Sequence, residues 1–65
     1  MYFAIYDFRT EDVSVLRSSS VFSRNREIYE FSTVQEARAK AVWLCIKYNK
    51  TVYFDFVGGG IFNYQ

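Results

Sequence analysis

A single long helix with apolar residues on two sides is the feature that most constrains how this chain can fold. Residues 33–50 are expected to form it, and successive side chains lie about 100° apart around such a helix. One apolar stripe contains Val34, Ala37, Ala41, Leu44, Cys45 and Tyr48. A second stripe, on roughly the opposite side, contains Ala39, Val42, Trp43 and Ile46. The first stripe suits packing on a sheet, so the second has no evident place in the core of so small a chain.

The residues at either end of this segment predict where the helix begins and ends. Thr33 and Glu36 have the spacing of a capping box, in which the Thr33 hydroxyl accepts from the backbone N–H of Glu36. The Glu36 carboxylate is expected to reach back to the N–H of Thr33. Lys47 and Lys50 lie near the end where the helix dipole favours cations, and Asn49 can adopt the left-handed conformation that ends a helix.

The rest of the chain alternates between short segments typical of β-strands and polar turns. Strands are expected at residues 2–8, 13–16, 28–31 and 51–57, and residues 61–64 could close a terminal hairpin. We therefore expect an α+β fold in the order β-β-β-α-β, which a further β-strand at residues 61–64 could complete. Residues 1–65 are expected to form one domain. The helix would pack on one face of a small antiparallel sheet of four or five strands. The other face, with tyrosines from several strands, is expected to have no covering layer.

Aromatic side chains have to supply most of the core of this domain. A chain of 65 residues buries only about 60% of the surface that it exposes when unfolded. Seven Phe, six Tyr and one Trp provide the bulk that such a small core needs. Cys45 is the only cysteine and histidine is absent, which excludes an internal disulfide and a Cys/His zinc site. Cys45 is expected to be a small buried core residue.

Few residues offer catalytic chemistry. General acid–base catalysis usually needs histidine or paired carboxylates, and the acidic residues here are dispersed along the chain. Asp7 and Asp55 could come together if the first and fourth strands were neighbours. The alternative is that they keep an edge or outer face of the sheet polar. The glycines at positions 58–60 lack the following helix of a phosphate-binding loop and are expected to form a turn. We therefore expect a non-enzymatic protein with no cofactor and no bound metal.

The second helix stripe is the candidate contact with another protein, because exposed apolar patches mark such contacts and Trp is favoured at their centres. The expected contact residues are Trp43, Val42, Ile46 and Ala39. The partner could be a foreign protein or a second copy of this chain. The second case would make a homodimer, and the chain would then be a self-associating structural protein. The alternative is that the N-terminal hairpin, or Val21 and Phe22, folds over Trp43 and makes it part of the core.

Nucleic-acid binding is the alternative function. Aromatic side chains on an open sheet face can stack on bases, and Arg17, Arg24 and Arg26 could contact phosphates or an acidic partner. These arginines belong to the polar segment of residues 17–26, which is expected to form either a long flexible hairpin loop or the weak extension of two strands. The net charge of only +1 and the interleaved acidic residues disfavour nucleic acid. No apolar run approaches the ~20 residues of a membrane span and no secretory signal is evident, so we expect a cytoplasmic protein without a membrane partner.

A resemblance to a known class of proteins lies in residues 29–37, with the sequence YEFSTVQEA, and in the alanine-rich helix and aromatic strand that follow. This region resembles very small phage-encoded host-takeover proteins. The phage T7 inhibitor of bacterial RNA polymerase similarly runs from a strand through a Thr-x-x-Glu-Ala helix start to a helix with Trp and then a strand. The resemblance covers residues 29–57, about half of the chain, and no functional residue is carried over. It implies a tiny non-enzymatic protein, encoded by a phage or mobile element, that binds and disables a host protein in the host cytoplasm.

Overall fold

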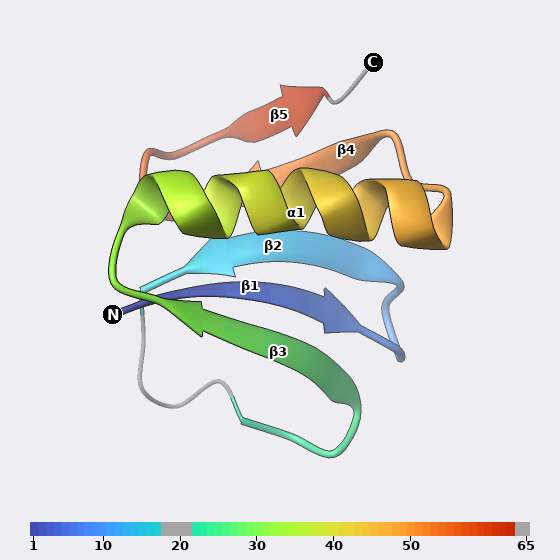
Figure 1. Ribbon diagram of the computed structural model, residues 1–65. Coiled ribbons are helices and arrows are strands. Elements are labelled where there is room, and N and C mark those ends of the chain that lie inside the picture. The colour runs from blue at the N-terminus through green and yellow to red at the C-terminus, as the bar shows by residue number, and fades with distance from the viewer. Residues whose placement is uncertain (18–21, 64–65) are drawn as a thin grey trace.

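The strands and the helix follow one another as the sequence predicts. A computed structural model describes residues 1–17 and 22–63 of the chain (Figure 1). Its elements are β1 (Tyr2–Asp7), β2 (Asp12–Leu16), β3 (Arg26–Phe31), α1 (Val34–Tyr48), β4 (Val52–Asp55) and β5 (Ile61–Asn63). The terminal hairpin is confirmed, since β4 and β5 pair through Val52↔Asn63 and Phe54↔Ile61. Tyr64, the expected end of the last strand, lies outside the described residues.

The sheet has the strand order β3-β1-β2-β4-β5, which confirms an α+β fold with one helix on a five-stranded sheet. β1 pairs antiparallel with both β2 and β3, and β4 pairs antiparallel with β5. The pairing of β2 with β4, through Ser14↔Phe54, is parallel, so the sheet is mixed. The helix causes this difference: α1 returns the chain to the end of the sheet where β3 began, and β4 then runs in the same direction as β3 and β2.

The helix begins and ends at the expected residues. Thr33 has an extended conformation (φ −124°, ψ 151°), and its hydroxyl accepts a hydrogen bond of 3.3 Å from the N–H of Glu36. The same hydroxyl donates to the Glu36 carboxylate at 2.7 Å. The Glu36 carboxylate thus binds the Thr33 side chain, where the capping box predicted the backbone N–H of Thr33. Asn49 ends the helix in the left-handed conformation (φ 58°, ψ 46°).

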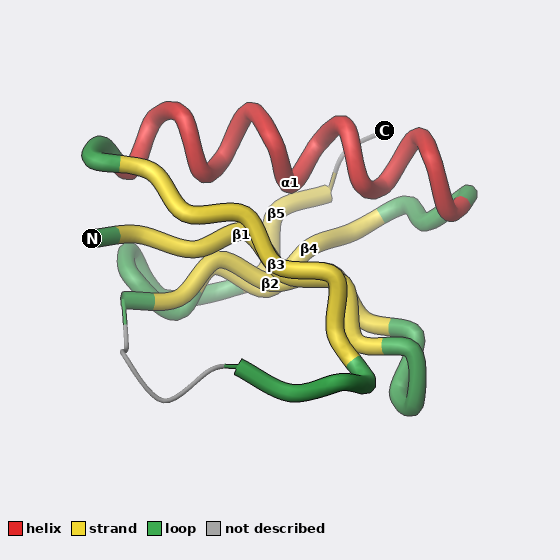
Figure 2. Tube along the Cα trace, turned by 60° about the horizontal axis from the view of Figure 1, so that its bottom comes forward, coloured by secondary structure: helices red, strands yellow, loops and turns green. Residues whose placement is uncertain are grey.

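The main core lies between the helix and one face of the sheet, where the two layers meet (Figure 2). Its buried members are Ala4, Tyr6, Val13, Val15, Ala37, Ala41, Leu44, Cys45 and Tyr53. The first helix stripe is thus confirmed as the core stripe, with Val34 and Tyr48 half-buried at its two ends. The ring of Tyr48 stacks on that of Tyr6, with centroids 3.8 Å apart.

The tyrosines of the sheet lie on the face that packs against the helix, so the expectation that they lie on the opposite, open face is wrong. Tyr6 and Tyr53 are buried, and Tyr2 and Tyr29 pack against the same core. The opposite face carries Phe3 and Ile5, which form a second buried cluster with Leu16 and Ile28 packed against it. Both faces of β1 are apolar, and the face with the small Ala4 is the one that a helix rich in alanine can approach closely. Strand alternation alone does not reveal this choice.

Candidate functional site

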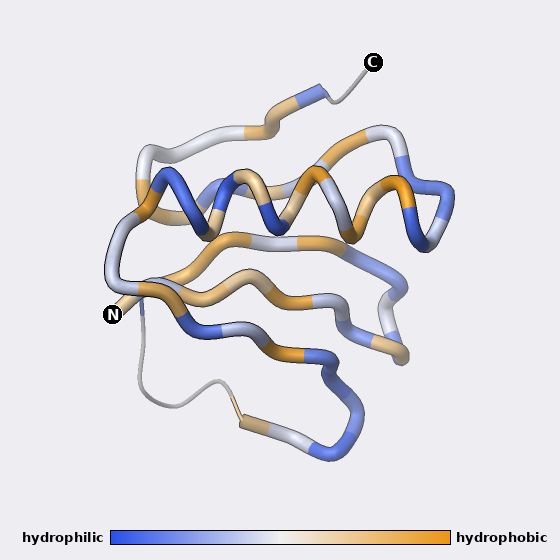
Figure 3. Tube along the Cα trace, viewed as in Figure 1, coloured by the Kyte–Doolittle hydropathy of each residue, from blue (hydrophilic) through white to orange (hydrophobic). Residues whose placement is uncertain are grey.

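The second apolar stripe of the helix lies on the surface of α1 that faces away from the sheet. Trp43 is 42% exposed, Ile46 is 60% exposed, and Ala39 is exposed as well. Val42 differs from the expectation, because it is half-buried against the core. It lies only about 60° around the helix from Cys45, at the border between the two stripes. We call Ala39, Val42, Trp43 and Ile46 the outer helix face; Figure 3 shows apolar positions recurring along all of α1.

Trp43 forms an aromatic corner with Tyr29 of β3. The two ring centroids are 6.1 Å apart and the ring planes meet at 83°, an edge-to-face geometry that aromatic pairs favour. The ammonium group of Lys40 lies 3.8 Å from the Trp43 ring centroid and 4.3 Å from that of Tyr29. The ammonium group of Lys47 lies 5.1 Å from the Trp43 ring centroid. The indole is thus held between the sheet edge and two lysines, while much of its surface stays open to water.

Glu27 fixes the position of one of these lysines. Its carboxylate accepts hydrogen bonds from Lys47 at 2.9 Å and from the hydroxyls of Tyr29 and Tyr48. Burial raises the pKa of Glu27, but these hydrogen bonds outweigh it and hold the pKa below its ordinary value. The hydrogen bonds to Glu27 in turn raise the pKa values of Tyr29, Tyr48 and Lys47. This cluster therefore ties β3 to the end of the helix with Glu27 and Lys47 both charged.

Lys40 contributes a positive charge that forms no ion pair with a carboxylate within residues 1–17 and 22–63. The neighbouring basic side chains Arg38, Lys47 and Lys50 each form an ion pair with an acidic residue, at N–O distances of 2.8, 2.9 and 3.2 Å. Among the described residues, the polar and ring interactions of the Lys40 ammonium group are those with the rings of Trp43 and Tyr29. The outer helix face therefore combines exposed apolar surface with one cation available to a partner.

The described part of the chain leaves this face open, so the alternative that other residues cover Trp43 is wrong for the segments that the structure describes. Phe22 packs on Phe3, with ring centroids 5.7 Å apart at 88°, and Phe3 belongs to the sheet face opposite the helix. Residues 22–25 accordingly run on that side of the sheet (Figure 2). The N-terminal hairpin forms the centre of the sheet and does not fold over the helix. Val21 lies outside the described residues.

The structure does not bring the three candidate arginines together. Arg17 follows β2 and lies over the ring of Tyr2, 5.2 Å from its centroid. Arg26 pairs with Asp7 at 3.0 Å, at the other end of β1 and about 17 Å away by strand geometry. Arg24 is exposed in the segment before β3, of which residues 18–21 lie outside the described residues. A continuous basic path for a phosphate backbone is therefore not formed by Arg17 and Arg26.

The acidic residues and glycines considered for catalysis have structural partners. Asp7 and Asp55 bind different arginines, and β2 lies between their strands, so they do not form a pair. The Asp55 carboxylate accepts hydrogen bonds of 3.0 Å from the N–H groups of Val57 and Gly58, and its carbonyl accepts one from Gly59. The glycine segment is confirmed as a turn, built around Asp55. No group of three or more His, Cys, Asp and Glu in the described residues is placed to hold a metal ion.

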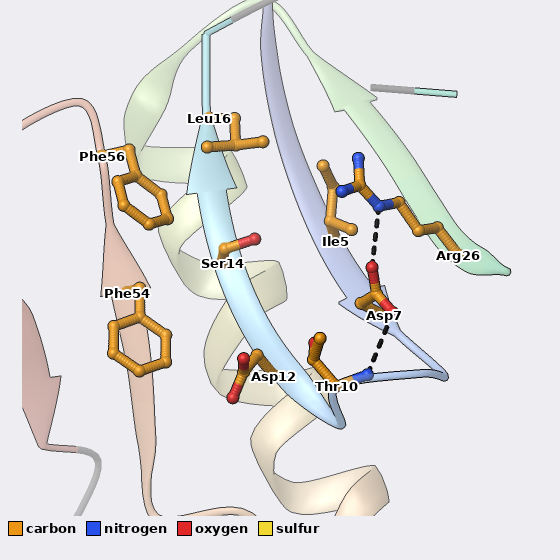
Figure 4. A pocket seen from close by; sticks show the side chains of 9 residues that line it. All are labelled: Ile5, Asp7, Thr10, Asp12, Ser14, Leu16, Arg26, Phe54 and Phe56. Atoms are coloured by element: carbon orange, nitrogen blue, oxygen red, sulfur yellow. Dashed lines mark hydrogen bonds and ion pairs between the residues drawn. The ribbon is translucent and has the colours of Figure 1, made fainter. Parts of the chain in front are cut away.

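A concave feature lies on the sheet face opposite the helix. It is a groove of about 200 Å³ that runs over β2, where Asp12, Ser14 and Leu16 lie, with Phe54 and Phe56 on the β4 side (Figure 4). The ion pair between Asp7 and Arg26 and the side chain of Ile5 complete it. The alternation of residues 51–57 already places both phenylalanines on one face of the sheet. Only the β2–β4 pairing brings Asp12 and Ser14 beside them.

Two residues of the Trp43 corner were not expected from the sequence. Lys40 precedes Trp43 by three positions, and residues at this spacing share a helix face, so this signal was available. Tyr29 lies on an expected strand, but the sequence does not indicate whether that strand runs beside the side of the helix that carries Trp43. Only the packing of α1 against β3 brings its ring to Trp43.

Comparison of the chain with protein-family models, curated proteins and solved structures finds no match. Within the described residues, no helix has both the length and the apolar character needed to cross a membrane.

Proposed function

We propose that this chain is a protein-binding module without enzymatic activity, which docks on another protein through the outer helix face. The exposed indole of Trp43 beside the uncompensated charge of Lys40 is the observation that carries the proposal. A tryptophan that is 42% exposed keeps roughly 100 Å² in water, taking about 250 Å² for the whole residue. Burial of that area in a partner would contribute on the order of 2.5 kcal/mol, the size of an interface hot spot.

The chemistry of this face indicates the chemistry of its partner. Trp43 and Ile46 require an apolar pocket, and Ala39, between them and the start of the helix, lets a partner backbone approach closely. Lys40 requires a carboxylate at the rim of that pocket. Because the indole already holds the Lys40 ammonium in place, little side-chain freedom is lost when the carboxylate binds. The partner is thus a protein surface with an apolar depression and an acidic edge.

A foreign partner fits this face better than a second copy of the chain. A two-fold symmetric contact places the same patch on both subunits, and the outer helix face contains no carboxylate. The outer helix face of one copy therefore offers no ion-pair partner to Lys40 of the other. A homodimer therefore ranks below a hetero-complex, and light scattering at increasing protein concentration distinguishes the two.

The resemblance of residues 29–57 to small phage host-takeover proteins suggests which class of partner to test. Under this proposal the chain is a phage or mobile-element inhibitor that occludes a surface of a host enzyme or defence protein. Its action requires only that the outer helix face stays accessible until the target is met. No cofactor takes part in it.

A substitution at Ile46 tests the proposal without disturbing the core. Ile46→Glu introduces a carboxylate at a position that is 60% exposed, so the fold should persist, as circular dichroism would verify. Gln35→Glu is the matched control: it adds the same charge to the same helix, about 16 Å away along the axis. Each tagged protein is incubated with a bacterial lysate, and the captured proteins are identified by mass spectrometry.

The expected result is a protein captured by the wild type and by the Gln35→Glu variant but lost with Ile46→Glu. That protein, once purified, should also protect Trp43 from a dissolved fluorescence quencher. Identical captured proteins for all three chains would contradict the proposal. So would tight binding of oligonucleotides that weakens steeply as salt is raised, because it would favour the nucleic-acid alternative.

A further inference from the structure

We propose that the groove over β2, flanked by Phe54 and Phe56, is a second binding site, which takes the side chain of an arginine presented by a partner protein. It lies on the sheet face opposite the outer helix face (Figure 4) and does not depend on the function proposed for that face. Three properties of the groove support this choice of ligand: its size, its aromatic wall and its charge.

The size of the groove suits one side chain. Pockets for small-molecule ligands usually enclose about 300–1,000 Å³, whereas this groove encloses about 200 Å³. It is open along the sheet, so a side chain can enter while the peptide that carries it stays outside. A single long side chain of a protein therefore fits better than a cofactor or a metabolite.

The aromatic wall suits a planar cation. The rings of Phe54 and Phe56 follow one another along one side of the groove, with centroids 6.3 Å apart and planes inclined by only 22°. Phe56 is 66% exposed, so its ring is available for contact. A guanidinium group is planar and weakly hydrated and stacks on aromatic faces more readily than a compact ammonium group does.

The charges of the groove leave one carboxylate uncompensated. Asp7 is neutralised by Arg26, which binds it at 3.0 Å. Asp12 lies two positions before Ser14 on the same face of β2, and Ser14 pairs with Phe54. In the part of the chain that the structure describes, the Asp12 carboxylate has no hydrogen bond or ion pair. An arginine stacked on the phenyl rings would place its charge where this carboxylate can accept from it.

The same charge argues against a nucleotide in this groove. A base could stack on Phe54 and Phe56, but its phosphate would then lie near the uncompensated carboxylate of Asp12. Repulsion between the two would oppose binding. The arginine side chain gains from both features of the groove, whereas a nucleotide gains from only one.

Titration of the isotope-labelled protein with two peptides tests the inference by NMR. The probe is acetyl-Gly-Arg-Gly-amide, and the control is the same peptide with citrulline, which keeps the shape of arginine and removes its charge. The arginine peptide should shift the amide signals of Asp12, Ser14, Phe54 and Phe56 and bind about fivefold or more tightly than the citrulline peptide. Equal shifts with the two peptides, or shifts confined to other residues, would overturn the inference.

Two variants with matched charge separate the groove from general attraction. Asp12→Asn should weaken binding of the arginine peptide by about two- to fivefold, because it removes the uncompensated carboxylate. Glu30→Gln, at an exposed position of β3 outside the groove, removes the same charge and should leave the binding unchanged. Equal effects of the two variants, or stronger binding of an oligothymidylate than of the peptide at this site, would refute it. Either failure leaves the outer helix face untested, since Trp43 and Ile46 do not line the groove.

Discussion

Truncation of Leu44 and Ile46 to alanine, one at a time, compares the two sides of the helix directly. Leu44 has no exposed surface, and Ile46 is 60% exposed only two positions later. Alanine is the best helix former at both positions, so the helix itself should not be weakened. The loss in the free energy of unfolding therefore reports how much apolar surface each side of the helix buries.

The expected losses differ widely. Leu44→Ala should lower the free energy of unfolding by about 3–5 kcal/mol, because it removes a fully buried side chain and leaves a cavity. Only the remaining 40% of Ile46 is shielded from water. Its burial therefore contributes about 0.6–1.2 kcal/mol, which is 40% of the free energy for a fully buried side chain. The better helix propensity of alanine returns about 0.4 kcal/mol, so Ile46→Ala should cost less than about 1 kcal/mol.

Urea unfolding followed by circular dichroism, at several protein concentrations, measures both values. A domain of 65 residues has a total stability of about 3–10 kcal/mol, so the Leu44 variant should be close to unfolding in water. If Ile46→Ala costs about 2 kcal/mol or more, its side chain is buried in solution, and the reasoning about the outer helix face is refuted. If that cost rises with protein concentration, a second copy of the chain covers this face.

Three further predictions concern acidic residues, the indole and the thiol. Burial raises the pKa values of Glu27 and Asp55 but hydrogen bonds outweigh it, and a guanidinium hydrogen bond lowers that of Asp7, so all three lie below their ordinary values. These carboxylates should stabilise the fold above about pH 4, and that contribution should be lost as the pH falls through their folded-state pKa values. A free energy of unfolding in urea that stays equal across this pH range would contradict the prediction. Acrylamide should quench the fluorescence of Trp43, the only tryptophan, in the isolated chain, and a shielded indole would count against the docking face. Burial raises the pKa of the Cys45 thiol, so an aromatic disulfide reagent should label it far more slowly in the native protein than in urea, and equal rates would show that it is not in the core.

Local patterns predicted the elements because their causes are local. The spacing of Thr33 and Glu36 set the start of the helix, Asn49 set its end, and alternation of apolar residues marked the strands. The 100° step of the helix also separated Leu44 from Trp43 and Ile46, so the candidate face was visible before any tertiary contact was known. Cys45 was placed in the core for the same reason.

Tertiary packing alone decided how these elements face one another. Both faces of β1 are apolar, so the side with Tyr6 became the helix side only through contact with α1. The parallel pairing of β2 with β4, which creates the groove around Phe54, and the contact of Tyr29 with Trp43 join residues far apart in the chain. A periodic pattern states which residues share a face, but the partner of that face is set by the free energy of packing the whole sheet and helix together. The helical periodicity thus predicts that Ala39, Trp43 and Ile46 stay exposed, whereas packing of the sheet against the helix buries part of Val42 and sets the aromatic and charged neighbours of Trp43.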